Sequence, residues 1–110
     1  MTHSSVFLFR AENAVFTSAV FSSFKLAQKW VYNNSLTGVV IEYPLNISTY
    51  DWSIKKGYFT IKTAIDRSPI FIGNFVSAYQ IQWHFKDGKF TDQFSRKILK
   101  FMNILLIFLN

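Results

Sequence analysis

Few residues of this chain have the chemistry of an active site. His84 is a histidine within an expected strand, whereas His3 lies near the N-terminus. A histidine on the polar face of a strand is most often a solvated side chain. A zinc site needs three or four convergent ligands, and the chain has no cysteine. We therefore predict no metal site and no cofactor.

Asp51 is the best candidate for an acid. Its neighbour Trp52 suggests a carboxyl group in an apolar pocket, which is the arrangement of a general acid. The alternative is a carboxylate in the first turn of a helix, where the helix dipole stabilises it. Glu42 and Asp51 could also form the carboxylate pair of a hydrolase, although their spacing does not require it. The serines and glycines form neither a nucleophile turn nor a phosphate loop, so we predict a non-enzymatic protein.

Aromatic side chains are the other candidates, because exposed rings are common anchors at protein interfaces. In a domain of this size most rings must fill the core. Tyr50 and Tyr58 flank charged residues, and we expect both at the surface. The predicted binding residues are Tyr50, Asp51, Trp52, Tyr58 and His84.

The first half of the chain predicts two strands, a helix and a third strand. Apolar runs at Val6–Phe9 and Val15–Phe21 are typical of neighbouring strands. A helix is expected from Phe24 to about Asn34, capped by Ser22 or Ser23, because its apolar residues share one face. The β-branched run at residues 39–41 predicts a strand that closes near Tyr43, before Pro44.

The second half begins with two short helices. The first is expected over residues 49–56, with Ser48 or Thr49 as its cap and Gly57 as its stop. An extended piece is expected at residues 58–62. The second helix begins at Ser68-Pro69, with proline at a position where its missing N–H costs nothing, and ends at Gly73.

The alternation of large apolar and polar residues over 79–86 predicts a strand with four large side chains on one face. These are Tyr79, Ile81, Trp83 and Phe85. Asp87-Gly88 then indicates a type I′ hairpin, because both central residues of that turn need positive φ. A short returning strand is expected at residues 89–91.

Composition indicates one domain. The chain has 110 residues, of which 50% are hydrophobic and 19% aromatic, enough for a single core. We predict an α+β fold: a mostly antiparallel sheet of four or five strands, with one main helix on a face, a short second helix at an edge and an appended C-terminal apolar helix. The domain would span residues 1–92 and the apolar tail residues 93–110.

The charge is uneven along the chain. Residues 1–54 hold three basic and three acidic side chains, whereas residues 55–110 hold nine basic and three acidic ones, giving a net charge of +6. A basic half can attract nucleic acid or an anionic membrane, but the chain shows no nucleic-acid-binding motif. We therefore expect a protein partner rather than nucleic acid.

The tail, Phe94–Leu109, is shorter than the roughly 20 apolar residues of a membrane-spanning helix. Three interpretations stay open: a helix packed on the domain, a helix that docks on a membrane surface or a partner, and a segment foreign to the domain. The N-terminus lacks the pattern of a secretion signal. We expect a cytoplasmic protein, with the membrane periphery as the alternative.

Several motifs occur in an order that resembles a family of small bacterial proteins of uncharacterised function, a domain of unknown function. They are Leu36-Thr37-Gly38-Val39, Tyr43-Pro44-Leu45, Tyr50-Asp51-Trp52, Gly57-Tyr58-Phe59, Ser68-Pro69 and Ser77-Ala78-Tyr79-Gln80. The resemblance covers residues 6–90 and implies no activity. The family's closing strand carries Glu-His where this chain has Ile81-Gln82, and a histidine where it has Arg10.

These observations favour a small non-enzymatic protein-binding or regulatory module. Its expected contact surface is the Tyr50–Tyr58 region together with the outward face of the last hairpin. The alternative is a protein held at a membrane surface by its basic, apolar tail. A small enzyme that uses Asp51 is the third hypothesis.

Overall fold

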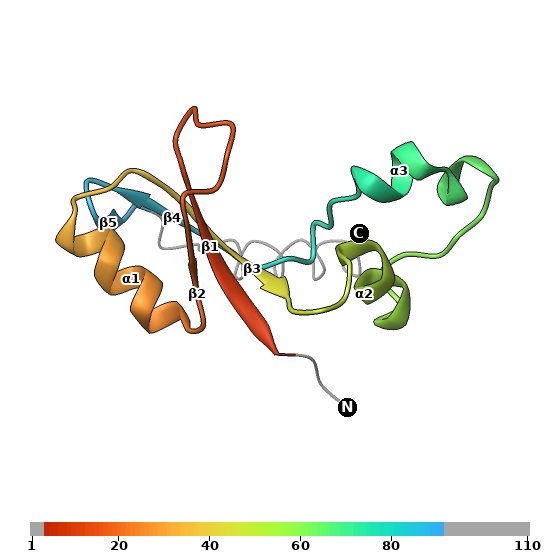
Figure 1. Cartoon of the computed structure of the whole chain (residues 1–110), viewed down its shortest axis with the longest axis horizontal. Coiled ribbons are helices and arrows are strands. Elements are labelled where there is room, and N and C mark those ends of the chain that lie inside the picture. The colour runs from red at the N-terminus through yellow and green to blue at the C-terminus, as the bar shows by residue number, and fades with distance from the viewer. Residues whose placement is uncertain (1–3, 92–110) are drawn as a thin grey trace, which may run out of the picture.

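The structure is a computed structural model, and it describes residues 4–91. Five strands form one antiparallel sheet in the order β2-β1-β3-β4-β5. Figure 1 shows this sheet and helix α1 in one half of the molecule, with helices α2 and α3 in the other. The strands are β1 (Ser5–Ala11), β2 (Ala19–Phe21), β3 (Gly38–Pro44), β4 (Gln82–Lys86) and β5 (Lys89–Phe90).

Helix α1 (Phe24–Asn33) covers one face of the sheet. It begins at Ser23, whose Oγ accepts a hydrogen bond from the backbone N–H of Leu26 (3.2 Å). The register aligns Phe9 with Val40, and Val40 with Trp83, so these side chains point to one face. The buried core joins that face to α1 and consists of Phe9, Ala27, Val31, Val40 and Phe85.

Aromatic rings extend this core along the helix. The rings of Phe24 and Trp83 lie 4.4 Å apart between centroids, and the ring of Phe9 meets Trp30 edge-on at 5.5 Å. Gly38 is required where β3 passes β1, since a Cβ there would lie 2.4 Å from the Arg10 carbonyl oxygen. Close packing of the two strands therefore explains Gly38, and ring contacts explain Trp30 and Trp83.

The β4–β5 hairpin closes the sheet as the sequence predicts. Asp87 and Gly88 have φ values of 51° and 86°, as a type I′ turn needs. The turn is attached to the segment after α1: the Gly88 N–H donates to the Leu36 carbonyl oxygen (2.8 Å), and the Asp87 N–H donates to Thr37 Oγ1 (3.0 Å).

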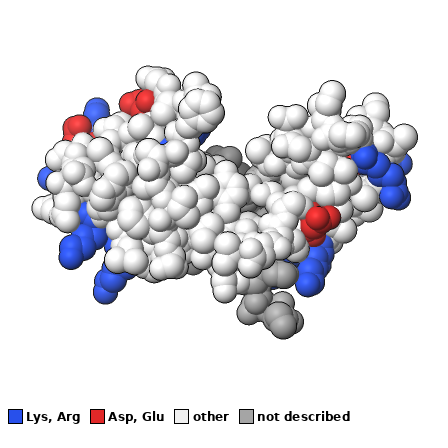
Figure 2. All heavy atoms as spheres, in the orientation of Figure 1, with Lys and Arg blue, Asp and Glu red and all other residues white. Residues whose placement is uncertain are grey.

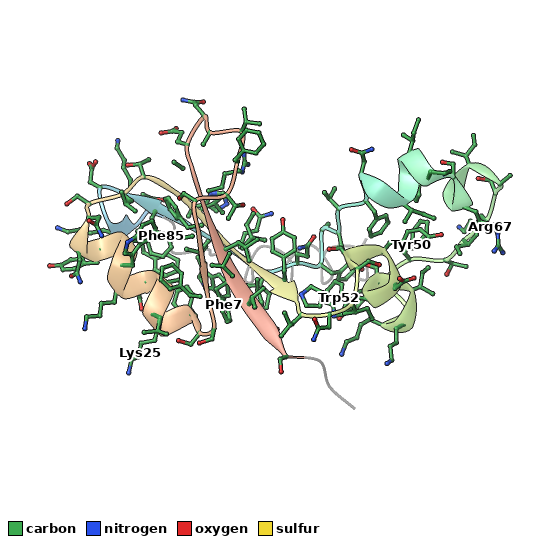
Figure 3. The ribbon with its side chains drawn as sticks, viewed as in Figure 1. Phe7, Lys25, Tyr50, Trp52, Arg67 and Phe85 are labelled. Carbon is green, nitrogen blue, oxygen red and sulfur yellow. The ribbon has the colours of Figure 1, made fainter. Side chains whose placement is uncertain are left out.

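The second half of the molecule, residues 48–79, is called here the α2–α3 lobe. It contains α2 (Thr49–Lys55), the 3-10 helix η1 (Ile65–Arg67) and α3 (Pro69–Gly73). Four rings pack together within it, with centroid separations of 5.1 to 6.2 Å: Tyr50, Phe59, Phe71 and Phe75. Figure 3 shows Tyr50 and Trp52 in this lobe, apart from Phe7 and Phe85 beside α1.

The α+β class and the antiparallel sheet are confirmed, with five strands. The helix over residues 24–34 and the caps at Ser48 and Ser68 are confirmed as well. The predicted apolar tail at residues 93–110, with its helix, lies outside the described residues.

Two predicted strands are shorter than expected, and one predicted extended segment is not a strand. Residues 15–18 belong to the β1–β2 loop rather than β2, and the expected piece at 58–62 is not a strand. The strand expected from Tyr79 begins only at Gln82. Its first residues instead form a turn, in which the Ser77 N–H donates to Gln80 Oε1 and the Gln80 N–H to the Ser77 carbonyl oxygen (both 3.2 Å).

Candidate functional site

Tyr50 is a structural residue, and its predicted place at the surface is wrong. Its side chain is only 6% exposed. Its hydroxyl donates a hydrogen bond of 2.6 Å to the backbone carbonyl oxygen of Asp66. Three phenylalanine rings surround it. Tyr50 therefore joins α2 to η1 from inside the lobe, and a partner could not contact its ring directly.

Asp51 is exposed and forms part of the N-terminal cap of α2. Its backbone N–H donates to Ser48 Oγ (2.9 Å), and the Ser48 hydroxyl donates to Asp51 Oδ2 (2.8 Å). These reciprocal bonds form a capping arrangement that satisfies a free N–H of the first turn. The structure thus places this carboxylate at a helix end instead of in an apolar pocket.

Trp52 and Tyr58 belong to a row of three rings. The ring of Tyr58 stacks on Tyr79 with centroids 4.1 Å apart and planes at 5°, and Trp52 meets Tyr58 edge-on at 5.4 Å. Tyr58 is 40% exposed. Tyr79 reaches this row because the turn at residues 77–80 takes it out of the sheet, which the strand prediction did not anticipate.

An exposed aliphatic surface on the same lobe was missed by the sequence interpretation. Ile65 is 72% exposed, Ile70 78% and Val76 79%, and Ile72 is also exposed. Helix α3 turns Phe71 towards Tyr50, which leaves the isoleucines on either side of Phe71 facing solvent. The apolar run Pro69–Ile72 could have indicated this surface in the sequence, because a five-residue helix cannot bury all of its side chains.

Asp66 organises the loop next to this surface. The backbone N–H groups of Lys62 (2.9 Å) and Thr63 (3.2 Å) both donate to Asp66 Oδ2. The Lys62 hydrogen bond, followed by those from Thr63, holds the pKa of Asp66 below its ordinary value. The carboxylate therefore fixes the path of the chain into η1.

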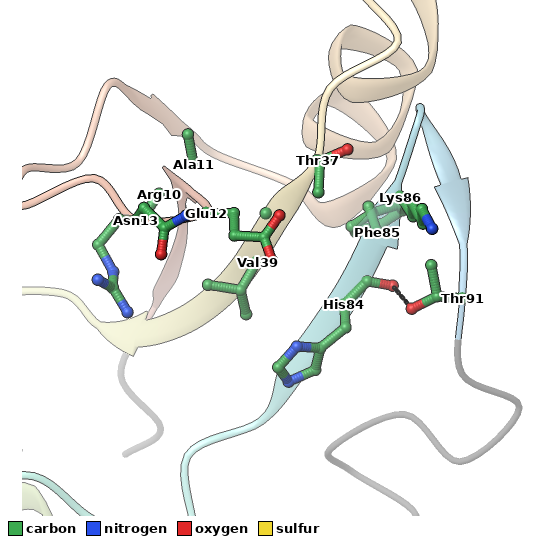
Figure 4. Close-up of a pocket in the computed structure, with 11 residues that line it drawn as sticks. Arg10, Ala11, Glu12, Asn13, Thr37, Val39, His84, Phe85, Lys86 and Thr91 are labelled. Carbon is green, nitrogen blue, oxygen red and sulfur yellow. Dashed lines mark hydrogen bonds between the residues drawn. The ribbon is translucent and has the colours of Figure 1, made fainter.

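His84 lies away from the lobe, on the sheet face opposite α1. The register places Arg10 beside Val39, and Val39 beside His84, in one row across three strands. This row crosses a groove of about 530 Å³, shown in Figure 4 and called here the His84 groove. Its lining includes none of Tyr50, Asp51, Trp52 and Tyr58. The sequence interpretation therefore combined residues from two separate places.

The His84 groove has a mixed polar lining. Arg10 and Lys86 supply positive charge, and Glu12 supplies a carboxylate. Arg10 also donates from Nη1 to the Ala14 carbonyl oxygen (2.9 Å), which holds the guanidinium beside the β1–β2 loop. Figure 4 shows Arg10 and Lys86 on opposite sides of His84. The lining brings together no nucleophile and base within hydrogen-bonding distance among the contacts that the structure describes.

Within residues 4–91, no group of three or more histidine, cysteine, aspartate or glutamate side chains is placed to hold a metal ion. None of the helices described has the length and hydropathy needed to span a membrane.

Comparison with known proteins identifies a family. No match is found among curated proteins or among solved structures. A family model described as "Domain of unknown function (DUF7710)" matches residues 6–91, nearly all of the described structure. This match agrees with the resemblance carried by the motifs between residues 36 and 80. The chain belongs to the DUF7710 family, a domain of unknown function.

Proposed function

We propose that this protein is a non-enzymatic protein-binding module that contacts its partner through the η1–α3 surface. This name denotes the exposed side chains of Ile65, Ile70, Ile72 and Val76. The observation that carries the proposal is their exposure. Large aliphatic side chains in water are costly, and exposed apolar surface on a small domain is typical of interaction sites.

The energy available at this surface is sufficient for recognition. Complete burial of an isoleucine or valine side chain contributes about 1.5–3 kcal/mol. Several such groups buried together can offset part of the rotational and translational entropy lost on association. The ring of Phe71 in α3 packs against Tyr50, Phe59 and Phe75. This packing holds α3 in place, which reduces the conformational entropy lost when a partner binds.

The chemistry of this surface favours a protein partner. Figure 2 shows a face on which uncharged atoms predominate, with cationic groups at several places, among them the outer end of the α2–α3 lobe, and fewer anionic ones. Nucleic acid is bound mainly through lysine and arginine contacts with phosphates. Trp52 and Tyr58, of which Tyr58 is exposed, add ring types that are frequent in protein interfaces.

Site-specific photocrosslinking tests this function. A photoreactive phenylalanine analogue is introduced at position 70 and, as a matched control, at position 17, an exposed polar site in the β1–β2 loop. We expect a discrete protein adduct from position 70 in cells that express the chain, and none from position 17. Mass spectrometry then identifies the partner for direct binding measurements with the purified protein.

Two matched double variants make the test specific. Ile70→Ser with Val76→Ser removes exposed aliphatic groups from the η1–α3 surface, and Val15→Ser with Phe16→Ser removes equally exposed groups from the β1–β2 loop, where both residues are 81% exposed. We expect only the first pair to abolish binding of the identified partner. Loss with the second pair alone would disprove the assignment of the surface.

A further inference from the structure

We propose that a second site, the groove between α1 and the β4–β5 hairpin, binds an extended acidic protein segment that carries aliphatic side chains. It is called here the α1–β5 groove. The proposal concerns a different surface from the η1–α3 surface and does not depend on it. It rests on three features of the groove: an apolar wall, a one-sided charge and a free strand edge.

The apolar wall comes from two elements. The groove has a volume of about 620 Å³ and lies between α1 and the last hairpin. Tyr32 on α1 is 61% exposed and Phe90 on β5 is 41% exposed. Phe90 is held in place by Phe85, with ring centroids 5.1 Å apart. The groove therefore offers fixed apolar surface that an aliphatic side chain can cover.

The charge of the lining has one sign. Lys25 and Lys29 on α1 and Lys89 on β5 line the groove, and the lining contains no carboxylate. Helix α1, FKLAQKWVYN, has no acidic residue. Asp87, in the hairpin turn, is the nearest acidic residue along the chain and is not part of the lining. Carboxylates of a bound segment would thus meet three ammonium groups around an apolar centre.

The free strand edge determines the conformation of the bound segment. β5 is the last strand in the sheet order and pairs with β4 alone among the described elements. Phe85 lies opposite Phe90, and the Thr91 N–H donates to the His84 carbonyl oxygen (3.3 Å). Inward and outward backbone groups alternate along an antiparallel strand. The N–H and carbonyl groups of Phe90 therefore point away from β4, towards the open edge.

An extended peptide satisfies these features together. Its backbone can hydrogen-bond to Phe90, as in strand addition to a sheet edge. Every second side chain of the bound strand then faces α1, where it can meet the two rings or Lys25 and Lys29. A nucleic acid would also meet the lysines, but it cannot continue a β-sheet. The strand edge therefore favours a polypeptide.

The test uses a fluorescein-labelled peptide as the probe, in which isoleucine and glutamate alternate at every second position, with threonine between them, so that both residue types share one face of the bound strand. Fluorescence anisotropy measures its affinity for the full chain and for two charge-matched double variants. Lys25→Glu with Lys29→Glu reverses two charges in the groove, and Lys55→Glu with Lys56→Glu reverses two charges on the α2–α3 lobe. All four lysines are exposed. We expect the first variant to bind about tenfold more weakly, and the second to change affinity by less than about twofold.

Two additional measurements separate the proposal from charge attraction alone. A peptide with serine in place of isoleucine keeps the charge and should bind about tenfold more weakly, because the apolar contact is lost. In nuclear magnetic resonance spectra, the backbone amide of Phe90 should shift when the original peptide is added. Dispersed spectra of the groove variant verify that it is folded.

Several results would overturn the proposal. Equal weakening by the two charge variants would show non-specific attraction. Equal affinity for the serine peptide would show that the rings of Tyr32 and Phe90 do not contribute to binding. Tighter binding of an oligouridylate than of the peptide, weakened by the same groove variant, would assign the groove to nucleic acid.

Discussion

Single residues of the α2–α3 lobe have structural roles that their sequence neighbours conceal. Tyr50 lies between Thr49 and Asp51, both polar, yet its ring is buried and its hydroxyl is bonded to Asp66. Sequence pattern alone cannot identify such a residue, because its burial depends on rings that arrive from positions 59, 71 and 75. Asp51 was correctly predicted at a helix start, because a cap depends only on residues three positions apart.

Asp66 makes the stability of the lobe dependent on pH. Its pKa is lowered in the folded protein, so the folded state gains stability at pH values above the unfolded pKa of about 3.9. That contribution is lost as the pH falls from about 4 through the lower, folded pKa. We expect Asp66→Asn to reduce the loss of stability in this range, because asparagine has no charge to lose. Urea unfolding at a series of pH values between 6 and 3 measures the effect.

The comparison of the two pH profiles decides this prediction. The free energy of unfolding of the original protein should fall more steeply below pH 4 than that of the variant. Parallel profiles would mean that the hydrogen bonds from Lys62 and Thr63 do not distinguish the ionised carboxylate from its neutral form.

At the scale of elements, local signals predicted most of the helices and turns. Serine caps begin α1, α2 and α3 at residues 23, 48 and 68, and Asp87-Gly88 forms the hairpin. These devices act within four residues, so sequence shows them directly. The period-two pattern was less reliable at Tyr79, where the Gln80 side chain accepts a hydrogen bond from the Ser77 N–H and a turn replaces the strand.

The cap of α2 can be tested by one substitution. Ser48→Ala removes the oxygen that accepts the Asp51 N–H and the hydroxyl that donates to the Asp51 carboxylate. We expect the free energy of unfolding to fall by about 1 kcal/mol. Urea denaturation measures this change.

Ser22→Ala is the matched control, since Ser22 is exposed and the cap of α1 is the neighbouring Ser23. We expect it to change the free energy of unfolding by less than about 0.5 kcal/mol. A similar loss in both variants would mean that the reciprocal bonds at Ser48 add no stability.

At the scale of the whole molecule, the described rings pack in two regions. Some lie between the sheet and α1, and the others, which include the row of Trp52, Tyr58 and Tyr79, lie within the α2–α3 lobe. The buried core of Phe9, Ala27, Val31, Val40 and Phe85 contains no residue of the lobe. This division was not predicted from the sequence. Hydrophobic composition indicates how many side chains are buried, but it gives no information on how they are divided between the sheet and the lobe.

Native-state hydrogen exchange tests whether the lobe opens by itself. Val40→Ala removes core volume in β3 and should lower the exchange free energy of the β1 and β3 amides by about 2 kcal/mol. If the lobe opens while the sheet stays folded, the substitution raises the free energy of the closed and the open state equally, because the sheet is folded in both. We therefore expect the exchange of the α3 amides to be unchanged.

An equal decrease at α3 and in the sheet would contradict this expectation. It would show that the two ring clusters unfold as one cooperative unit, so that the η1–α3 surface is as stable as the core.

The position of Phe85 in the core has a consequence for synthesis in the cell. Its ring completes the layer formed by Phe9, Val31 and Val40, and the turn that follows it is fastened to the chain near Leu36. A ribosome releases the N-terminal strands and α1 long before it releases the last hairpin. The apolar inner side of this incomplete sheet stays open to solvent during that interval, so a nascent chain truncated before residue 85 should be a substrate for chaperones.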